Sequence, residues 1–180
     1  MIVLFYVIFL ATVIQRLFEL RLSKKNEKSM IASGGEVIYK KDIPFMMALH
    51  TLWFVSLLVE FNMKVVQFDI VIFAPFIFFF FLGQLFRYLA ITELKGRWCT
   101  KVIDMKGAMP IASGVYKVIR HPNYLGVILE FVALPLAFEL YFTAGVFSLL
   151  NLFFVFHRIS VENKLYYERA SLYNGKGNPS

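Results

Sequence analysis

Long apolar runs separated by short polar segments dominate the chain and predict helices that cross a membrane. Residues 1–14 carry no charged side chain and are interpreted as a retained anchor rather than a cleaved leader. Residues 44–61 carry only His50 and Glu60 as ionisable groups, and residues 68–86 carry a single aspartate. A bilayer needs about 20 mostly apolar residues per helix. Each of these three regions therefore predicts one span.

The fourth apolar region, residues 124–156, has 33 positions and is too long for one upright helix. It is interrupted between Pro135 and Tyr141, where Glu139 lies, so it predicts two short helices joined by a tight turn. The expected fold is a single all-α integral membrane domain over residues 1–180. It has a short cytosolic helical cap, a C-terminal helix and five transmembrane helices, at about 1–20, 44–61, 68–88, 123–138 and 140–157.

The positive charges follow this division of the chain. Of 19 Lys and Arg residues, seven lie in residues 16–43, one in 62–67, seven in 87–123 and four after residue 157. Lys and Arg gather in cytoplasmic loops, so five crossings with the N-terminus outside place 18 of the 19 on the cytoplasmic side. A four-helix count would separate the tail from the other basic segments. The net charge of +7 is therefore attributed to the membrane topology and to attraction to an anionic leaflet, and not to a nucleic-acid binding site.

The amino-acid composition narrows the class of protein further. The chain is 59% hydrophobic and 17% charged, against about 45–50% and about 25% for soluble domains. Cys99 is the only cysteine, which excludes a disulfide-built fold. One cysteine and three widely spaced histidines match no metal-ligand spacing, so no metal site is expected.

The segment between the third and fourth spans carries the most candidate chemistry. Pro122 suits the first turn of a helix, because proline lacks the N–H that would be unpaired there. Arg120 and His121 would then lie at the cytosolic mouth of the fourth span, beside free backbone N–H groups that form a ready anion site. The alternative is that both residues only mark the cytoplasmic interface.

Polar positions also recur along the tail and inside the spans. A helical spacing of three or four places five residues on one face of the C-terminal helix: Arg158, Glu162, Tyr166, Arg169 and Tyr173. This face is expected either to close over a cytosolic mouth or to be an ordinary interfacial helix with an ion pair. Glu130 lies within the fourth span, where a carboxylate marks a polar cavity or a paired site by default. His50 is expected to be neutral and hydrogen-bonded to a neighbouring helix, Glu139 to cap the outer turn, and Cys99 to be a small buried residue.

These residues resemble the isoprenylcysteine carboxyl methyltransferase family, integral-membrane enzymes that use S-adenosylmethionine. The central motif of the family is represented here by Gly114, Tyr116, Arg120, His121, Pro122, Tyr124 and Gly126. The approach to it is represented by Arg87, Ala90, Leu94, Gly96, Trp98 and Thr100, and its closing Arg-x-x-x-Glu-Glu element by Arg158 and Glu162. The chain departs from the pattern at Asn163, where the family has a second acidic residue.

The resemblance implies that S-adenosylmethionine lies between the cap and the last two spans. By this likeness, the cofactor is held by Tyr116, His121, Pro122, Asn123, Tyr124 and Glu162. The catalytic positions are Arg120, Arg158 and Glu162, with the two arginines near the acceptor or the cofactor carboxylate. No Gly-x-Gly-x-x-Gly motif follows a strand, so the common soluble methyltransferase design is not expected.

The implied reaction is O-methylation of a lipophilic acceptor that enters from the bilayer. The acceptor is a prenylcysteine carboxylate or, for a bacterial plasma membrane, the hydroxyl of an alkylpyrone-type polyketide lipid. Membrane lipids are expected neighbours, whereas no nucleic acid and no obligate protein partner are expected.

Two alternatives remain open at this point. One is a membrane reductase of the sterol-reductase type, which would use basic residues in 95–106 to bind the 2′-phosphate of NADPH. The other is a small transporter without catalytic activity, with Glu130 and His50 forming a polar pathway.

Overall fold

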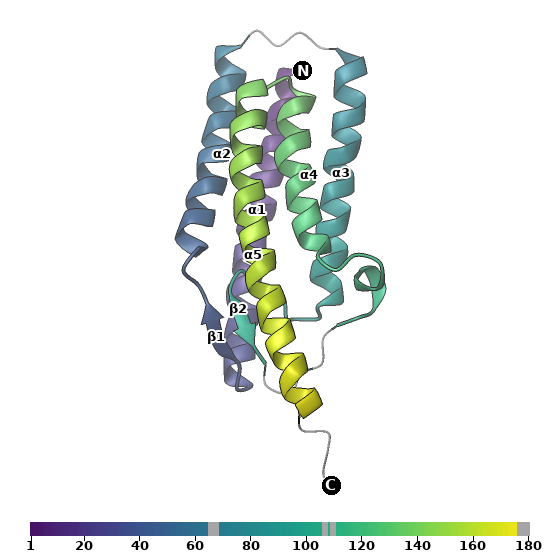
Figure 1. The fold of residues 1–180 in the computed structure, drawn as a ribbon. Coiled ribbons are helices and arrows are strands. Elements are labelled where there is room, and N and C mark those ends of the chain that lie inside the picture. The colour runs from purple at the N-terminus through teal and green to yellow at the C-terminus, as the bar shows by residue number, and fades with distance from the viewer. Residues whose placement is uncertain (65–68, 106–107, 109–110, 176–180) are drawn as a thin grey trace.

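In the computed structural model of the chain, long helices run side by side as a bundle, and a short sheet lies at one end of it (Figure 1). The structure describes residues 1–64, 69–105, 108 and 111–175, without the side chains of 165–166 and 169–175. The elements in chain order are α1 (Ile2–Ala32), β1 (Glu36–Tyr39), α2 (Ile43–Met63), α3 (Ile70–Glu93), β2 (Val102–Asp104), the 3-10 helix η1 (Gly114–Lys117), α4 (Pro122–Ala137) and α5 (Tyr141–Gly175). The start of α1 and the end of α5 lie at opposite ends of the bundle.

Every region predicted as a span is helical, although the bounds differ. Helix α1 continues for 12 residues beyond the predicted end at residue 20. Four helices, α1, α2, α3 and α5, are long and apolar enough to cross a membrane. Helix α4 has 16 residues and therefore extends about 24 Å, against about 30 Å for the hydrocarbon core. The structure thus supports a helical membrane protein with four full-length candidate spans and one shorter apolar helix.

The turn between α4 and α5 lies where Pro135–Tyr141 predicts it. Glu139 has a positive φ of 54°, and its carbonyl oxygen accepts a hydrogen bond from Lys64 Nζ at 2.6 Å. Helix α5 is capped by Glu60, which comes from the end of α2. Its carboxylate accepts the backbone N–H groups of Phe142 and Thr143 at 3.0 and 2.8 Å. Unpaired N–H groups at the first turn of a helix are a normal site for a carboxylate.

The prediction of a purely helical cap is wrong. Between α3 and α4 the described residues form strand β2 and the short η1 helix, and β2 pairs with β1 as an antiparallel two-stranded sheet. In the register, Glu36 faces Asp104 and Val37 faces Ile103. These strands have only four and three residues, which is too short for a clear alternating pattern in the sequence. The sheet ties the α1–α2 connection to the α3–α4 connection.

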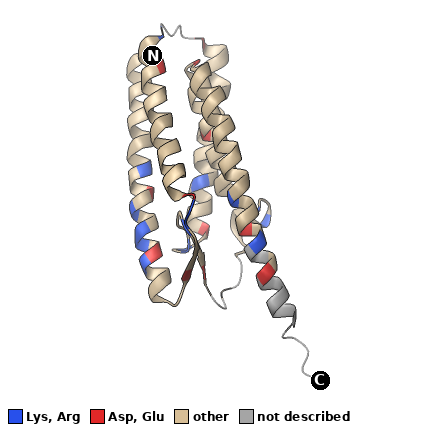
Figure 2. Ribbon diagram, turned by 60° about the vertical axis from the view of Figure 1, so that its left-hand side comes forward, with Lys and Arg blue, Asp and Glu red and all other residues tan. Residues whose placement is uncertain are grey.

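Aromatic side chains fill the core near the other end of the bundle. Phe5 stacks on Phe61, and Trp53 stacks on Phe131 with ring centroids 4.5 Å apart. Other large apolar side chains point outward, as on the lipid side of membrane helices; Phe78, for example, is 63% exposed. Lys and Arg residues gather in the half of the bundle that carries the sheet (Figure 2), which agrees with the predicted division of charge.

Helices α3 and α4 pack closely because two glycines face each other. A Cβ at Gly126 would lie 2.6 Å from the carbonyl oxygen of Gly83, and a Cβ at Gly83 would lie 2.9 Å from that of Gly126. The same Cβ at Gly126 would also contact the Arg87 side chain. Only glycine allows this approach, which brings the polar residues of α3 against α4.

Candidate active site

A cavity of about 1100 Å³ opens at the sheet end of the bundle and is lined by residues from all five helices. All but one of the predicted site residues line it, namely Tyr116, Arg120, His121, Asn123, Tyr124, Arg158 and Glu162. The exception is Pro122, which is buried and is not among the lining residues. The structure therefore brings the predicted residues from η1, α4 and α5 together around one space.

Local sequence explains how two of the elements are placed. Pro122 occupies the first turn of α4 and His121 precedes it as the N-cap residue, as predicted. Gly114 begins η1 with a positive φ of 53°, and a Cβ there would run into the carboxylate of Glu93. Glu93 instead accepts a hydrogen bond from Ser113, which fixes η1 against the end of α3. The glycine thus orients the segment that carries Tyr116.

Glu162 is the centre of the polar cluster at this end. Its Oε1 accepts a hydrogen bond from the Tyr124 hydroxyl and lies 3.7 Å from Nη2 of Arg158. Its Oε2 lies 3.7 Å from Nδ1 of His121. The Glu162 side chain is 31% exposed, so its carboxylate contacts these neighbours and remains accessible from the cavity.

Arg158 connects this cluster to α2. Its Nη1 lies 3.3 Å from Oδ1 of Asp42, the residue before α2, and its Nε donates to the Tyr124 hydroxyl at 3.3 Å. Both Arg158 and Asp42 are buried. The sequence analysis did not single out Asp42. The available signal was an aspartate just before a proline-containing helix start, which favours an ordinary N-cap instead.

Asn163 takes a place beside His121. The His121 Nε2 and the Asn163 Oδ1 are 3.3 Å apart, a distance that fits a hydrogen bond from the ring to the amide oxygen. An amide at this position keeps a hydrogen-bond acceptor for the ring but removes the negative charge of an acidic residue. In this part of the cluster Glu162 therefore supplies the carboxylate.

Tyr116 and Asn123 offer groups that are free to meet a ligand. Burial, together with the charges of Glu162 and Glu93, raises the pKa of Tyr116 to about 12, so its phenol is neutral throughout the physiological range. Asn123 Oδ1 is buried and has no hydrogen-bond partner among the described residues. Such an unpaired buried acceptor is uncommon and is available to a hydrogen-bond donor that enters the cavity.

Arg120 lies at the rim. It is exposed, and its guanidinium carbon is 5.6 Å from the centre of the Tyr167 ring. Helix α5 continues past this point, as the predicted C-terminal helix requires. Of the predicted polar face, Arg158 and Glu162 reach the cavity, whereas the side chains of Tyr166, Arg169 and Tyr173 lie outside the described residues.

Comparison with known proteins assigns this arrangement to a family. A sequence model of the isoprenylcysteine carboxyl methyltransferase (ICMT) family matches residues 76–168, which include every predicted site residue. The chain belongs to the ICMT family. Its members are methyltransferases and use S-adenosylmethionine as a general property.

Two curated bacterial proteins are similar to the chain, and both carry descriptions without a function. The uncharacterised protein YpbQ of Bacillus subtilis (strain 168) is 29% identical over 164 residues, which cover 89% of this chain and 95% of that protein. An uncharacterised protein of Haemophilus influenzae (strain ATCC 51907 / DSM 11121 / KW20 / Rd) is 28% identical over 140 residues, which cover 73% of this chain and 76% of that protein. No solved structure matches the chain.

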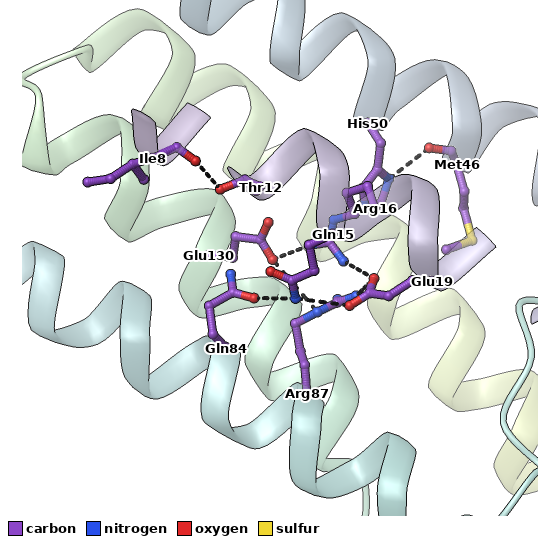
Figure 3. A network of polar contacts seen from close by, with 10 residues as sticks. All are labelled: Ile8, Thr12, Gln15, Arg16, Glu19, Met46, His50, Gln84, Arg87 and Glu130. Carbon is purple, nitrogen blue, oxygen red and sulfur yellow. Dashed lines mark hydrogen bonds and ion pairs between the residues drawn. The ribbon is translucent and has the colours of Figure 1, made fainter. Parts of the chain in front are cut away.

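A second polar group lies deeper in this ICMT-family protein, in the middle of the bundle (Figure 3). Arg16 pairs with Glu19 at 2.8 Å and with Glu130, while Arg87 pairs with Glu19 and lies 3.8 Å from Glu130. Gln15 bridges Glu19 and Gln84. The prediction that Glu130 is a paired site is therefore confirmed. No local pattern in the sequence pointed to Arg16 as its partner, because Arg16 lies 114 positions earlier in the chain.

Apolar side chains from α1 and α2 form another wall of the cavity. Leu17, Met47 and Val55 line it and are each at least half exposed, with relative exposures of 53%, 53% and 50%. Because these side chains line the cavity and stay half exposed, this wall is open and is not covered by other side chains of the bundle. An opening at this level of a membrane protein faces lipid rather than water.

Proposed function

We propose that the chain is a membrane-embedded, S-adenosylmethionine-dependent O-methyltransferase of a lipophilic acceptor. The observation that carries this proposal is the shared cavity. It places the family's motif residues at the sheet end of the bundle and apolar, outward-facing side chains such as Leu17 and Val55 along the wall between α1 and α2. A polar cofactor and a lipophilic acceptor can therefore reach the same cavity from different sides.

The residues at the sheet end fit the chemical groups of S-adenosylmethionine. Arg120 and Arg158 suit its carboxylate, and Glu162 suits its ammonium or ribose hydroxyl groups. Tyr116 and Tyr124 offer aromatic faces to the sulfonium. The unpaired Asn123 Oδ1 suits a donor N–H or O–H. When bound, the cofactor supplies an electrophilic methyl group.

The protein contributes placement and the exclusion of water. Methyl transfer needs the nucleophilic oxygen in line with the methyl group, at about 3–3.5 Å. A carboxylate acceptor is already nucleophilic and needs only an arginine to hold it, whereas a hydroxyl acceptor also needs a group that takes its proton. In our assignment Arg120 and Arg158 orient the acceptor or the cofactor, and Glu162 or His121 serves as the base where one is required.

The acceptor and the topology complete the proposal. The acceptor is a prenylcysteine carboxylate or the hydroxyl of an alkylpyrone-type polyketide lipid. All five helices cross a bacterial plasma membrane, with the N-terminus outside and the sheet end in the cytoplasm. Basic residues at the sheet end and similarity to two bacterial proteins support this arrangement.

The test is transfer of a radiolabelled methyl group from S-adenosylmethionine into bacterial lipid extracts by the purified, membrane-reconstituted protein, with mass analysis of the product. We expect a lipid product that gains one methyl group. Glu162→Gln should lower cofactor affinity about 10- to 100-fold, because it removes the charge from charge-assisted hydrogen bonds. Glu168→Gln is the matched control, since Glu168 is an exposed residue of the same helix near Lys164 and does not line the cavity.

Two results would contradict the proposal. The first is measurable affinity for NADPH with none for S-adenosylmethionine, which would favour the reductase. The second is wild-type methyl transfer by both Glu162→Gln and His121→Ala, which would remove the proposed site residues from the reaction.

A further inference from the structure

His50 presents a hydrogen-bond acceptor to the inner part of the cavity. Its Nδ1 lies 2.8 Å from the carbonyl oxygen of Met46, one turn earlier in the same helix α2, so the expected hydrogen bond to a neighbouring helix is wrong. A carbonyl only accepts, so Nδ1 carries the proton, and in the neutral ring Nε2 keeps its lone pair. His50 lines the cavity, and the structure gives Nε2 no hydrogen bond to any described residue.

The charges around His50 already balance one another. His50 interacts electrostatically with Arg16 and Glu130, and Figure 3 shows all three residues in the same inner polar group. That group contains two arginines and two glutamates in mutual contact, with Arg16 and Glu130 paired directly. A carboxylate entering here would meet two resident carboxylates and no surplus positive charge within the group. A neutral group that donates a hydrogen bond meets no such penalty.

Apolar side chains continue the cavity away from this point. Val13 and Leu17 of α1 and Phe54, Val55 and Leu58 of α2 line the same space. Thus a polar acceptor atom and a balanced ionic group adjoin an open apolar wall. This combination suits an amphiphile with a small polar end and a long apolar chain.

We infer that the inner part of the cavity binds a long-chain lipid hydroxyl, which donates its hydrogen bond to Nε2 of His50, while the apolar chain lies along the wall between α1 and α2. This rests on the proposed function only in naming that lipid as the methyl acceptor. Of the two acceptor classes proposed above, it selects the hydroxyl and disfavours the carboxylate. His50 is here a positioning residue that sets specificity.

The experiment measures binding without cofactor, in nanodiscs of neutral phosphatidylcholine, from the fluorescence of Trp53 and Trp98. The probes are 4-dodecylphenol and dodecanoate, compared at equal membrane concentration and at a pH at which the acid is ionised. We expect the phenol to bind at least about tenfold more tightly than the carboxylate, the amount one such hydrogen bond provides.

Three variants make the result specific. His50→Phe keeps a ring but removes the acceptor, and should lose about tenfold in phenol affinity. His50→Gln can place an amide oxygen near the position of Nε2 and should retain most of the binding. His157→Gln is the matched control: His157 bonds to Tyr39 on the exposed side of α5, does not line the cavity, and should bind the phenol like the wild type.

A measurement on the unaltered protein covers the case in which His50→Phe fails to fold. In spectra of ring-¹⁵N-labelled histidine, 4-dodecylphenol should shift Nε2 of one of the three histidines. No shift, equal phenol binding by His50→Phe and wild type, or preferred binding of dodecanoate would each overturn the inference. Phenol binding as predicted without any methyl transfer would instead refute the proposed function and leave this site in place.

Discussion

The two polar regions of the cavity differ in how their charges are held. At the sheet end, the Glu162 side chain is 31% exposed. It accepts a hydrogen bond from Tyr124 and lies 3.7 Å from both Arg158 and His121. In the inner group, Glu130 is fully buried and Arg87 is 3% exposed, and each charge faces an opposite charge. Partly exposed groups can exchange a neighbour for a ligand, whereas buried paired charges cannot be parted cheaply. We therefore assign cofactor binding to the sheet end and structural integrity to the paired arginines and glutamates of the inner group.

The two regions also differ in how the chain assembles them. Most of the sheet-end residues lie between 116 and 163, inside the segment that the family model matches. The inner group combines Arg16 and Glu19, which lie outside that segment, with Arg87 and Glu130 inside it. The N-terminal helix thus contributes directly to a space that residues of the family motif also line.

The largest expected effect is loss of stability when one inner charge is removed. Glu130→Ala leaves the Arg16 and Arg87 guanidinium groups with one carboxylate between them, in a buried setting. Removing one partner of a buried ion pair costs about 3–5 kcal/mol. We expect a large fall in the thermal unfolding midpoint of the purified protein in detergent.

Glu139→Ala is the control for that variant. Glu139 lies at the α4–α5 turn with its carboxylate 3.8 Å from a partly exposed Lys64, and such pairs contribute about 0–1 kcal/mol. If both substitutions lower the thermal unfolding midpoint equally, the inner group has no special structural role. The proposed difference between the inner group and the sheet end is then wrong.

The second effect concerns the sheet end and its single thiol. Cys99 lines the cavity, and burial raises the pKa of its thiol to about 11 from an ordinary value near 9. The thiolate is the reactive form, so at pH 8 its fraction is about 100-fold lower than that of an unperturbed thiol. Alkylation by iodoacetamide, followed by intact mass, should be slow and should rise about tenfold per pH unit until the pH approaches 11.

The protein unfolded in detergent and urea provides the reference rate. We expect this unfolded sample to react about 100-fold faster at pH 8 than the folded protein. Equal rates would show that Cys99 is as accessible to water as in an unfolded chain, and would contradict its burial in the wall of the cavity.

The smallest effect tests the contact between the two regions. Gly126 belongs to the family motif, yet a Cβ there would contact Arg87 of the inner group and the backbone of Gly83. Gly126→Ala should therefore cost about 1–3 kcal/mol through overpacking, measured as a lower unfolding midpoint.

Gly145→Ala is the matched control, because nothing lies within 4 Å of a Cβ at that position in α5. Alanine favours a helix over glycine, so this variant should be as stable as the wild type or slightly more stable. If Gly126→Ala is as stable as the wild type, α3 and α4 can move apart at little cost. The sheet end and the inner group are then not coupled through this contact.

Sequence patterns predicted the parts of the molecule that depend on local signals. Hydropathy located the five α-helices of the described residues, Pro122 gave the start of α4, and all the predicted site residues except Pro122 line one cavity. The β1–β2 pair was missed because pairing of such short strands depends on tertiary contacts rather than on periodicity. The pairing of Glu130 with Arg16 and of Arg158 with Asp42 was missed for the same reason, because only the packing of the helices brings these distant residues close.

The most direct test of the central claim is a calorimetric titration of the reconstituted protein with S-adenosylmethionine and, separately, with NADPH. The account predicts one S-adenosylmethionine site per chain, weakened at least about tenfold in His121→Ala and unchanged in His157→Ala, with no binding of NADPH. Binding of NADPH alone, or S-adenosylmethionine binding that is the same in both variants, would contradict it.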